Sequence, residues 1–146
     1  NLKFKVHDNC IFDKNYENYF DLILSNPPFF FTDKVLKSKN ISINNSKYIS
    51  ELDLEKWLHN IILYLKAKGT AFIINRFENI DFMLEILKKF NLEVTTTPIL
   101  SFKGSKPKNV LLKITKSDYF IEKTSNAIII HDKLSKYSKD IVNWFK

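Results

Sequence analysis

Glycine is almost absent from this sequence of 146 residues, which contains only Gly69 and Gly104. A nucleotide-binding α/β domain normally begins with a glycine-rich turn between a strand and a helix, where the backbone closely approaches the ligand. Neither glycine can form that turn. The chain also begins with Asn1, in the middle of an expected strand. We therefore expect either a fragment of a larger domain or a protein that binds no nucleotide.

Cysteine and arginine are equally scarce. The single cysteine, Cys10, excludes an internal disulfide framework and a cysteine-based zinc site. Arg76 is the single arginine, although the net charge is +7. This charge favours an anionic partner such as a nucleic acid, but a lysine-rich, arginine-poor composition can also reflect a biased genome.

Long apolar runs and signal sequences are also missing. Lysines interrupt every apolar run before it reaches membrane-spanning length, and no signal peptide opens the chain. We expect a cytoplasmic protein that makes no membrane contact. His7, His59 and His131 lack metal-ligand spacing, so we expect no metal site.

The hydrophobic pattern alternates between the periods of strands and helices. It predicts strands at 2–6, 20–25, 70–74, 92–101, 110–115 and 127–130, and helices at 51–66, 79–90 and 135–145. Strands alternating with helices predict a parallel sheet. The short loop before 110–115 predicts an antiparallel hairpin, with that return strand at the sheet edge. The expected fold class is α/β: the second half of a doubly wound, Rossmann-like sheet that ends in this hairpin.

Local signals mark the ends of the helices and of the domain. Ser50, followed by Asp53, is expected to cap the first helix, and Gly69 lies just past its expected end. Asn79 is expected to cap the second helix. We expect residues 1–117 to form half of a domain and residues 118–146 to form a small C-terminal extension of it.

One segment, Asn26-Pro27-Pro28-Phe29, follows a nearly apolar strand at its carboxyl end. Open α/β sheets bind ligands at such ends. Asn26 offers a side-chain acceptor, and the prolines fix φ and carry no N–H, so the carbonyls of Asn26 and Pro27 point outward. Phe29 offers a flat apolar face. The segment suits a planar group that bears an exocyclic amine.

Methylating such an amine is difficult because its lone pair is delocalised. Accepting both amine hydrogens draws the nitrogen toward tetrahedral geometry and aims its lone pair at a sulfonium methyl. Positioning and hydrogen bonding would then be the main catalytic contributions. A base in nucleic acid would first have to be flipped out or already unstacked. The plainer alternative is that Pro27-Pro28 ends a strand and Phe29 packs in the core.

Charged residues are expected around this segment. Asp8 follows the strand 2–6 and is either a ligand of the methyl donor's adenine or an ordinary loop aspartate. Two lysine clusters are either RNA phosphate contacts at the rim of the site or solvated loops. They are Lys34, Lys37 and Lys39 in the loop 32–50, and Lys103, Lys106 and Lys108 in the hairpin.

These residues resemble the class I S-adenosylmethionine-dependent methyltransferases. Residues 20–29 match the fourth motif of that class, and Val6-His7-Asp8 looks like its acidic third motif. More narrowly, the chain is similar to the bacterial valine-tRNA adenine-N6 methyltransferases, a small methyltransferase domain family. That similarity also rests on 106–112, on 127–130 and on the aromatic end Trp144-Phe145.

The resemblance implies a methyltransferase sheet, S-adenosylmethionine as cofactor and tRNA as substrate. By it, Asn26 and the Pro27 carbonyl hold the adenine N6, and Phe29 stacks on the base where the family usually has tyrosine. Asp8 and Asn26 contact the cofactor. The glycine-rich first motif and the acidic ribose-binding residue are missing, so the chain resembles only the C-terminal part of a member. A separate N-terminal half is therefore a possible partner.

Three alternatives remain. Methylation of guanine N2 in ribosomal RNA also uses Asn-Pro-Pro-Phe, but those enzymes usually place a histidine soon afterwards, where this chain has Phe30-Phe31. Methylation of protein glutamine N5 uses Asn-Pro-Pro-Tyr. The third alternative is an inactive remnant or a split-gene product without catalysis.

Overall fold

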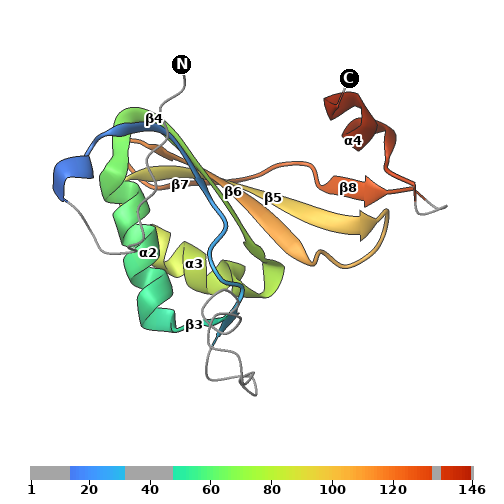
Figure 1. The fold of residues 1–146 in the computed structure, drawn as a ribbon, viewed down its shortest axis with the longest axis horizontal. Helices are drawn as coiled ribbons and strands as arrows, with labels where there is room; N and C mark the ends of the chain where they lie inside the picture. The colour runs from blue at the N-terminus through green and yellow to red at the C-terminus, as the bar shows by residue number, and fades with distance from the viewer. Residues whose placement is uncertain (1–13, 32–47, 133–135, 146) are drawn as a thin grey trace.

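The computed structural model describes residues 14–31, 48–132 and 136–145. The expected strand 2–6 lies outside them. The described residues form a six-stranded sheet in the order β1-β4-β6-β5-β7, with β8 also paired to β5 (Figure 1). The strands are β1 (Phe20–Ser25), β4 (Leu65–Arg76), β5 (Leu92–Phe102), β6 (Asn109–Lys116), β7 (Ile121–Thr124) and β8 (Ile128–His131).

The sheet is mixed, and the hairpin is the reason. β1 and β4 are parallel, whereas β6 is antiparallel to both β4 and β5. The expected hairpin is confirmed, but the expectation that its return strand lies at the sheet edge is wrong. β6 lies between β4 and β5. Alternating apolar residues suit a half-buried strand at either position, so the pattern could not distinguish them.

Two helices pack on one face of the sheet (Figure 1). Helix α2 (Glu51–Tyr64) begins at Ser50, whose Oγ accepts a hydrogen bond from the Asp53 backbone N–H at 3.0 Å, which confirms the expected cap. Helix α3 (Ile80–Leu87) follows the 3-10 turn η3 (Phe77–Asn79). The core between these helices and the sheet contains fully buried side chains, including Leu54, Leu58, Met83, Leu87, Ile73 and Leu112.

Gly69 lies within β4 and does not end α2. The helix ends at Leu65, which is already extended. A Cβ at position 69 would lie 2.8 Å from the Phe20 carbonyl oxygen and 2.8 Å from Leu65 Cδ1. Glycine is therefore needed here because β1 closely approaches β4, and the expectation of a helix cap at Gly69 is wrong.

The first strand is an edge strand within the described part of the chain. β1 pairs only with β4 there, and its Leu22 and Leu24 are 55% and 74% exposed. An apolar run of this kind is typical of a buried parallel strand, but these two leucines are exposed. Among the described strands, β1 therefore has one edge without a paired neighbour, and its two exposed leucines lie on one face of the strand.

The chain beyond β6 adds short elements. β7 and β8 both run parallel to β5, and β7 was not expected from the sequence. Helix α4 (Lys139–Trp144) follows β8, and the 3-10 turn η1 (Lys14–Tyr16) precedes β1. A separate two-stranded pair joins β2 (Phe30–Phe31) to β3 (Tyr48–Ile49). No helix within the described ranges is long and apolar enough to cross a membrane.

Candidate functional site

The Asn-Pro-Pro-Phe segment leaves the carboxyl end of β1, as expected. Asn26 is exposed, Pro27 is buried, and Pro28 and Phe29 are half-buried. Phe29 is therefore only partly covered, unlike a residue that simply packs in the core. The strand ends at Ser25 and β2 begins at Phe30, so the segment links two strands.

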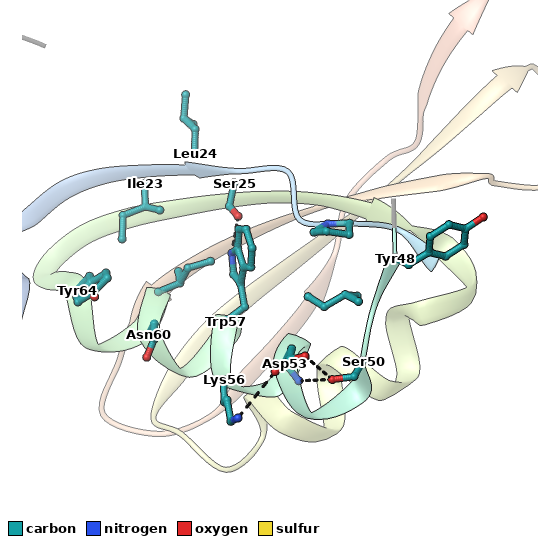
Figure 2. Close-up of a pocket in the computed structure, with 13 residues that line it drawn as sticks. Ile23, Leu24, Ser25, Tyr48, Ser50, Asp53, Lys56, Trp57, Asn60 and Tyr64 are labelled. Atoms are coloured by element: carbon teal, nitrogen blue, oxygen red, sulfur yellow. Dashed lines mark hydrogen bonds and ion pairs between the residues drawn. The ribbon is translucent and has the colours of Figure 1, made fainter. Parts of the chain in front are cut away.

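Helix α2 is hydrogen-bonded to the residue that precedes this segment. The indole Nε1–H of Trp57 donates a hydrogen bond to the Ser25 hydroxyl at 2.9 Å. Figure 2 shows Trp57 rising from α2 toward Ser25, which points down from β1. The residue that immediately precedes Asn26 is thus tied to a helix 32 positions away in the sequence.

The turn after β4 is hydrogen-bonded to Phe29, the last residue of the segment. The Asn79 side-chain Nδ2 donates to the Phe29 carbonyl at 3.0 Å and to the Asn75 Oδ1 at 2.8 Å. The same Asn75 oxygen accepts from the Arg76 backbone N–H at 2.7 Å. Asn79 occupies the N-cap position of α3, as expected, but its side chain makes no capping hydrogen bond there.

Aromatic contacts continue beyond the segment. The rings of Phe30 and Tyr48 lie 6.0 Å apart across the β2–β3 pair. The Arg76 guanidinium carbon lies 5.7 Å from the centre of the Phe30 ring, which is a cation–π distance. The single arginine of the chain is thus placed at the end of β4, directly beside the segment.

A cavity of about 550 Å³ adjoins the segment on the α2 side. Such a volume falls within the range of small-ligand sites. Figure 2 shows Trp57, Ser25 and Ile23 around it, with Tyr48 and the Ser50–Asp53 cap at one end. Pro28 also lines it, so the cavity contacts the Asn-Pro-Pro-Phe segment itself.

The predicted lysines fall into two groups. Lys103, Lys106 and Lys108 are exposed in the β5–β6 hairpin. Asn109 of β6 pairs with Arg76 of β4, and the Phe77 N–H donates to the Lys108 carbonyl at 2.9 Å, so the hairpin extends from the sheet end that carries the segment. Lys34, Lys37, Lys39 and Asp8 lie outside the described residues.

The described residues fit only part of a cofactor site. Gly69 is packed inside β4, and Gly104 lies in the hairpin with φ of 82°. Neither forms a strand-to-helix cradle for a nucleotide. The described residues place the segment Asn26 to Phe29 at the carboxyl end of β1, with Asn26 exposed and Phe29 half-buried. Within the described ranges, no group of three or more histidine, cysteine, aspartate or glutamate residues is arranged to hold a metal ion.

Trp57, Asn75 and Asn79 were not expected from the sequence to contribute to this site. Trp57 matched the apolar face of a helix, and Asn79 matched a helix cap. The local signal that could have identified Asn75 is a polar residue at a core position of β4, in the alternating row after Ala71 and Ile73. A buried amide requires partners, and these partners surround the segment.

Comparison with known proteins supports the fold. The structure is similar to that of a predicted O-methyltransferase from Agrobacterium tumefaciens, with a TM-score of 0.61 and 15% identity, covering 87% of this chain and 51% of that one. The M1.HpyAVI–SAM complex is also similar, with a TM-score of 0.39 and 13% identity, covering 68% and 45%. No protein-family model matches the sequence, and no curated protein is significantly similar to it. The similarity to the O-methyltransferase shows that the chain has a methyltransferase-like fold. The chain spans about half the length of each of these structures.

Proposed function

We propose that this chain is the substrate-binding part of an S-adenosylmethionine-dependent N-methyltransferase, and that its substrate is the N6 amine of an adenine in tRNA. One observation carries the proposal: the Asn-Pro-Pro-Phe segment leaves the carboxyl end of a parallel strand in a methyltransferase-like sheet and is tied at both ends. Bound S-adenosylmethionine would supply the methyl group.

The proposed roles follow from the chemistry of the segment. Asn26 and the Pro27 carbonyl accept the two amine hydrogens, and Phe29 stacks on the base. Asn26 is exposed and Phe29 is half-buried, so both are accessible to a base that has left its stack. The amine proton becomes acidic as the methyl group is transferred and can pass to water, so no strong base is required and orientation is the main contribution of these residues.

Charge supports RNA as the substrate class. The net charge is +7, and three exposed lysines lie in the hairpin that extends from the same end of the sheet. Lysine contacts with phosphates position RNA without reading its sequence. In this proposal Asp8 contacts the cofactor, Lys34, Lys37 and Lys39 join the RNA surface, a separate N-terminal half supplies the glycine-rich motif, and the protein acts in the cytoplasm.

The test incubates the chain with unmodified tRNA and S-adenosylmethionine. It is done with and without a separate N-terminal half that carries the glycine-rich motif. The expected product is N6-methyladenine, and Asn26→Ala should remove it. Asn91→Ala, at an exposed turn before β5, is the matched control and should retain activity. N2-methylguanine or N5-methylglutamine as the product would replace the adenine assignment. An active Asn26→Ala variant would overturn the mechanism, and no methylation with either preparation would favour a remnant.

A further inference from the structure

Two buried asparagines lie directly behind the Asn-Pro-Pro-Phe segment. Asn75 is fully buried and Asn79 is 4% exposed, and with Thr96 they are the buried polar residues of the described ranges. Asn75 occupies the last buried position of β4, in a row that is otherwise made of Leu65, Gly69, Ala71 and Ile73. An amide at such a position is unfavourable unless its hydrogen bonds are made.

Hydrogen bonds connect Asn75 to Asn79, and Asn79 to the Phe29 carbonyl of the segment. Asn75 Oδ1 accepts from two N–H donors, the Arg76 backbone and the Asn79 side chain, which fixes the orientation of its amide. Asn75 Nδ2 has no partner among the described residues. Asn75 therefore serves as an acceptor that holds Asn79 in place. The second hydrogen of Asn79 Nδ2 then points at the Phe29 carbonyl, 50 positions earlier in the chain.

The Asn79 side chain makes this long-range contact and does not cap helix α3. It lies at the N-cap of α3, where an asparagine side chain normally accepts from the second or third N–H of the helix. Here the side chain donates to Phe29 and leaves the helix start without a side-chain cap. The 3-10 turn η3 runs directly into α3, so the Asn79 backbone is itself helical (φ −94°, ψ 0°) and the Phe77 carbonyl accepts from the Ile80 N–H.

The Phe29 carbonyl belongs to the peptide that joins Phe29 to Phe30. Fixing that carbonyl fixes the peptide plane after the two prolines, whose φ angles are already restricted. Trp57 fixes Ser25 at the other end. Residues 26–29, which include the carbonyls of Asn26 and Pro27 and the ring of Phe29, therefore lie between two anchored points.

We propose that Asn79, held by Asn75, is a positioning residue that sets the orientation of Phe29 and of the amine-accepting carbonyls. The proposal rests on the proposed function, because the orientation matters only if this segment binds an amine. Asn79 does not touch the substrate; it acts through the Phe29 carbonyl.

The test compares Asn79→Asp with the wild-type chain. Aspartate is as good an N-cap as asparagine but cannot donate when ionised, so it removes the bond to the Phe29 carbonyl; a merely structural role at the start of α3 would leave the affinity for adenosine unchanged. The positioning role predicts that the carbonyl ¹³C resonance of Phe29, detected through the Phe30 N–H, moves by more than it does in the exposed control Asn91→Ala. Affinity for adenosine, used as the probe amine, should fall about tenfold, because the groups that bind it are no longer held in one orientation.

Each result is decisive. An unchanged Phe29 carbonyl resonance or an unchanged adenosine affinity in a folded Asn79→Asp chain overturns the proposal. If that variant does not fold, Asn79→Ala, which also removes the donor, is judged by the same two measurements. A wild-type chain that fails to bind adenosine contradicts the proposed function, and the carbonyl resonance still decides whether Asn79 holds the segment.

Discussion

The Trp57 indole donates a hydrogen bond to the Ser25 hydroxyl at 2.9 Å, so helix α2 is attached to the strand end that immediately precedes Asn26. Trp57→Phe should remove this bond and lower the free energy of unfolding by about 1 kcal/mol. Ser25→Ala should have a similar effect, and urea denaturation measures both.

The double variant separates this bond from general packing. If the bond accounts for the losses, the combined variant should lose clearly less than the sum of the two single losses. Strictly additive losses would mean that Trp57 and Ser25 act independently.

Replacing either glycine with alanine should lower the free energy of unfolding, but for different reasons. Gly69→Ala places a Cβ 2.8 Å from the Phe20 carbonyl oxygen, so it should cost roughly 1–3 kcal/mol by overpacking. Gly104→Ala meets no atom within 4 Å but has φ of 82°, so it should cost about 1–2 kcal/mol through backbone strain.

Asparagine substitutions distinguish these causes in thermal unfolding. Asparagine tolerates positive φ, so Gly104→Asn should be milder than Gly104→Ala. At position 69 the larger side chain should be worse than alanine. The opposite order at either position would contradict the cause assigned to it.

The cap of α2 should stabilise the helix that lines the cavity. Ser50→Ala removes the acceptor for the Asp53 N–H and should destabilise the chain by about 1 kcal/mol. Ser50→Thr keeps the acceptor and should recover most of this loss in chemical denaturation. An equal loss in both variants would show that the hydroxyl is not the cause.

Hairpin lysines should contribute electrostatically to RNA affinity. Lys106→Gln should weaken tRNA binding and reduce the slope of log K against log salt concentration by roughly 0.7 if one phosphate contact is lost. Lys68→Gln is the control, because Lys68 is also exposed but lies near the start of β4, at the opposite end of the sheet. Filter binding across a salt series measures both slopes. Equal slopes for the two variants would exclude the hairpin from the RNA surface.

The features that could be predicted from the sequence are those determined by local residue patterns. Helix α2 was predicted from its apolar spacing and from Ser50, and the position of Asn26 at a strand end was predicted from the prolines. The placement of β6 was not predictable in this way, because an alternating strand has the same pattern at an edge and between two strands. Topology of this kind depends on which long-range pairs form.

The asparagine pair shows the same limit within the site. Asn79 carries the signal of a helix cap, and its actual partner, the Phe29 carbonyl, is 50 positions away. Gly69 carries the signal of a helix end, yet its role depends on how closely Phe20 approaches. In both cases a tertiary contact outweighs the local preference.

The position of β6 between β4 and β5 has a consequence for the order of assembly during synthesis. β4 and β5 leave the ribosome first, yet they are not neighbours in the sheet, and each pairs with β6. Among the described strands, the β1–β4 pair that precedes the Asn-Pro-Pro-Phe segment therefore has no neighbour on its β4 side until residues 109–116 have emerged. A nascent chain that stalls before this point would expose an unpaired edge on β4, where chaperones or other copies of the chain could bind.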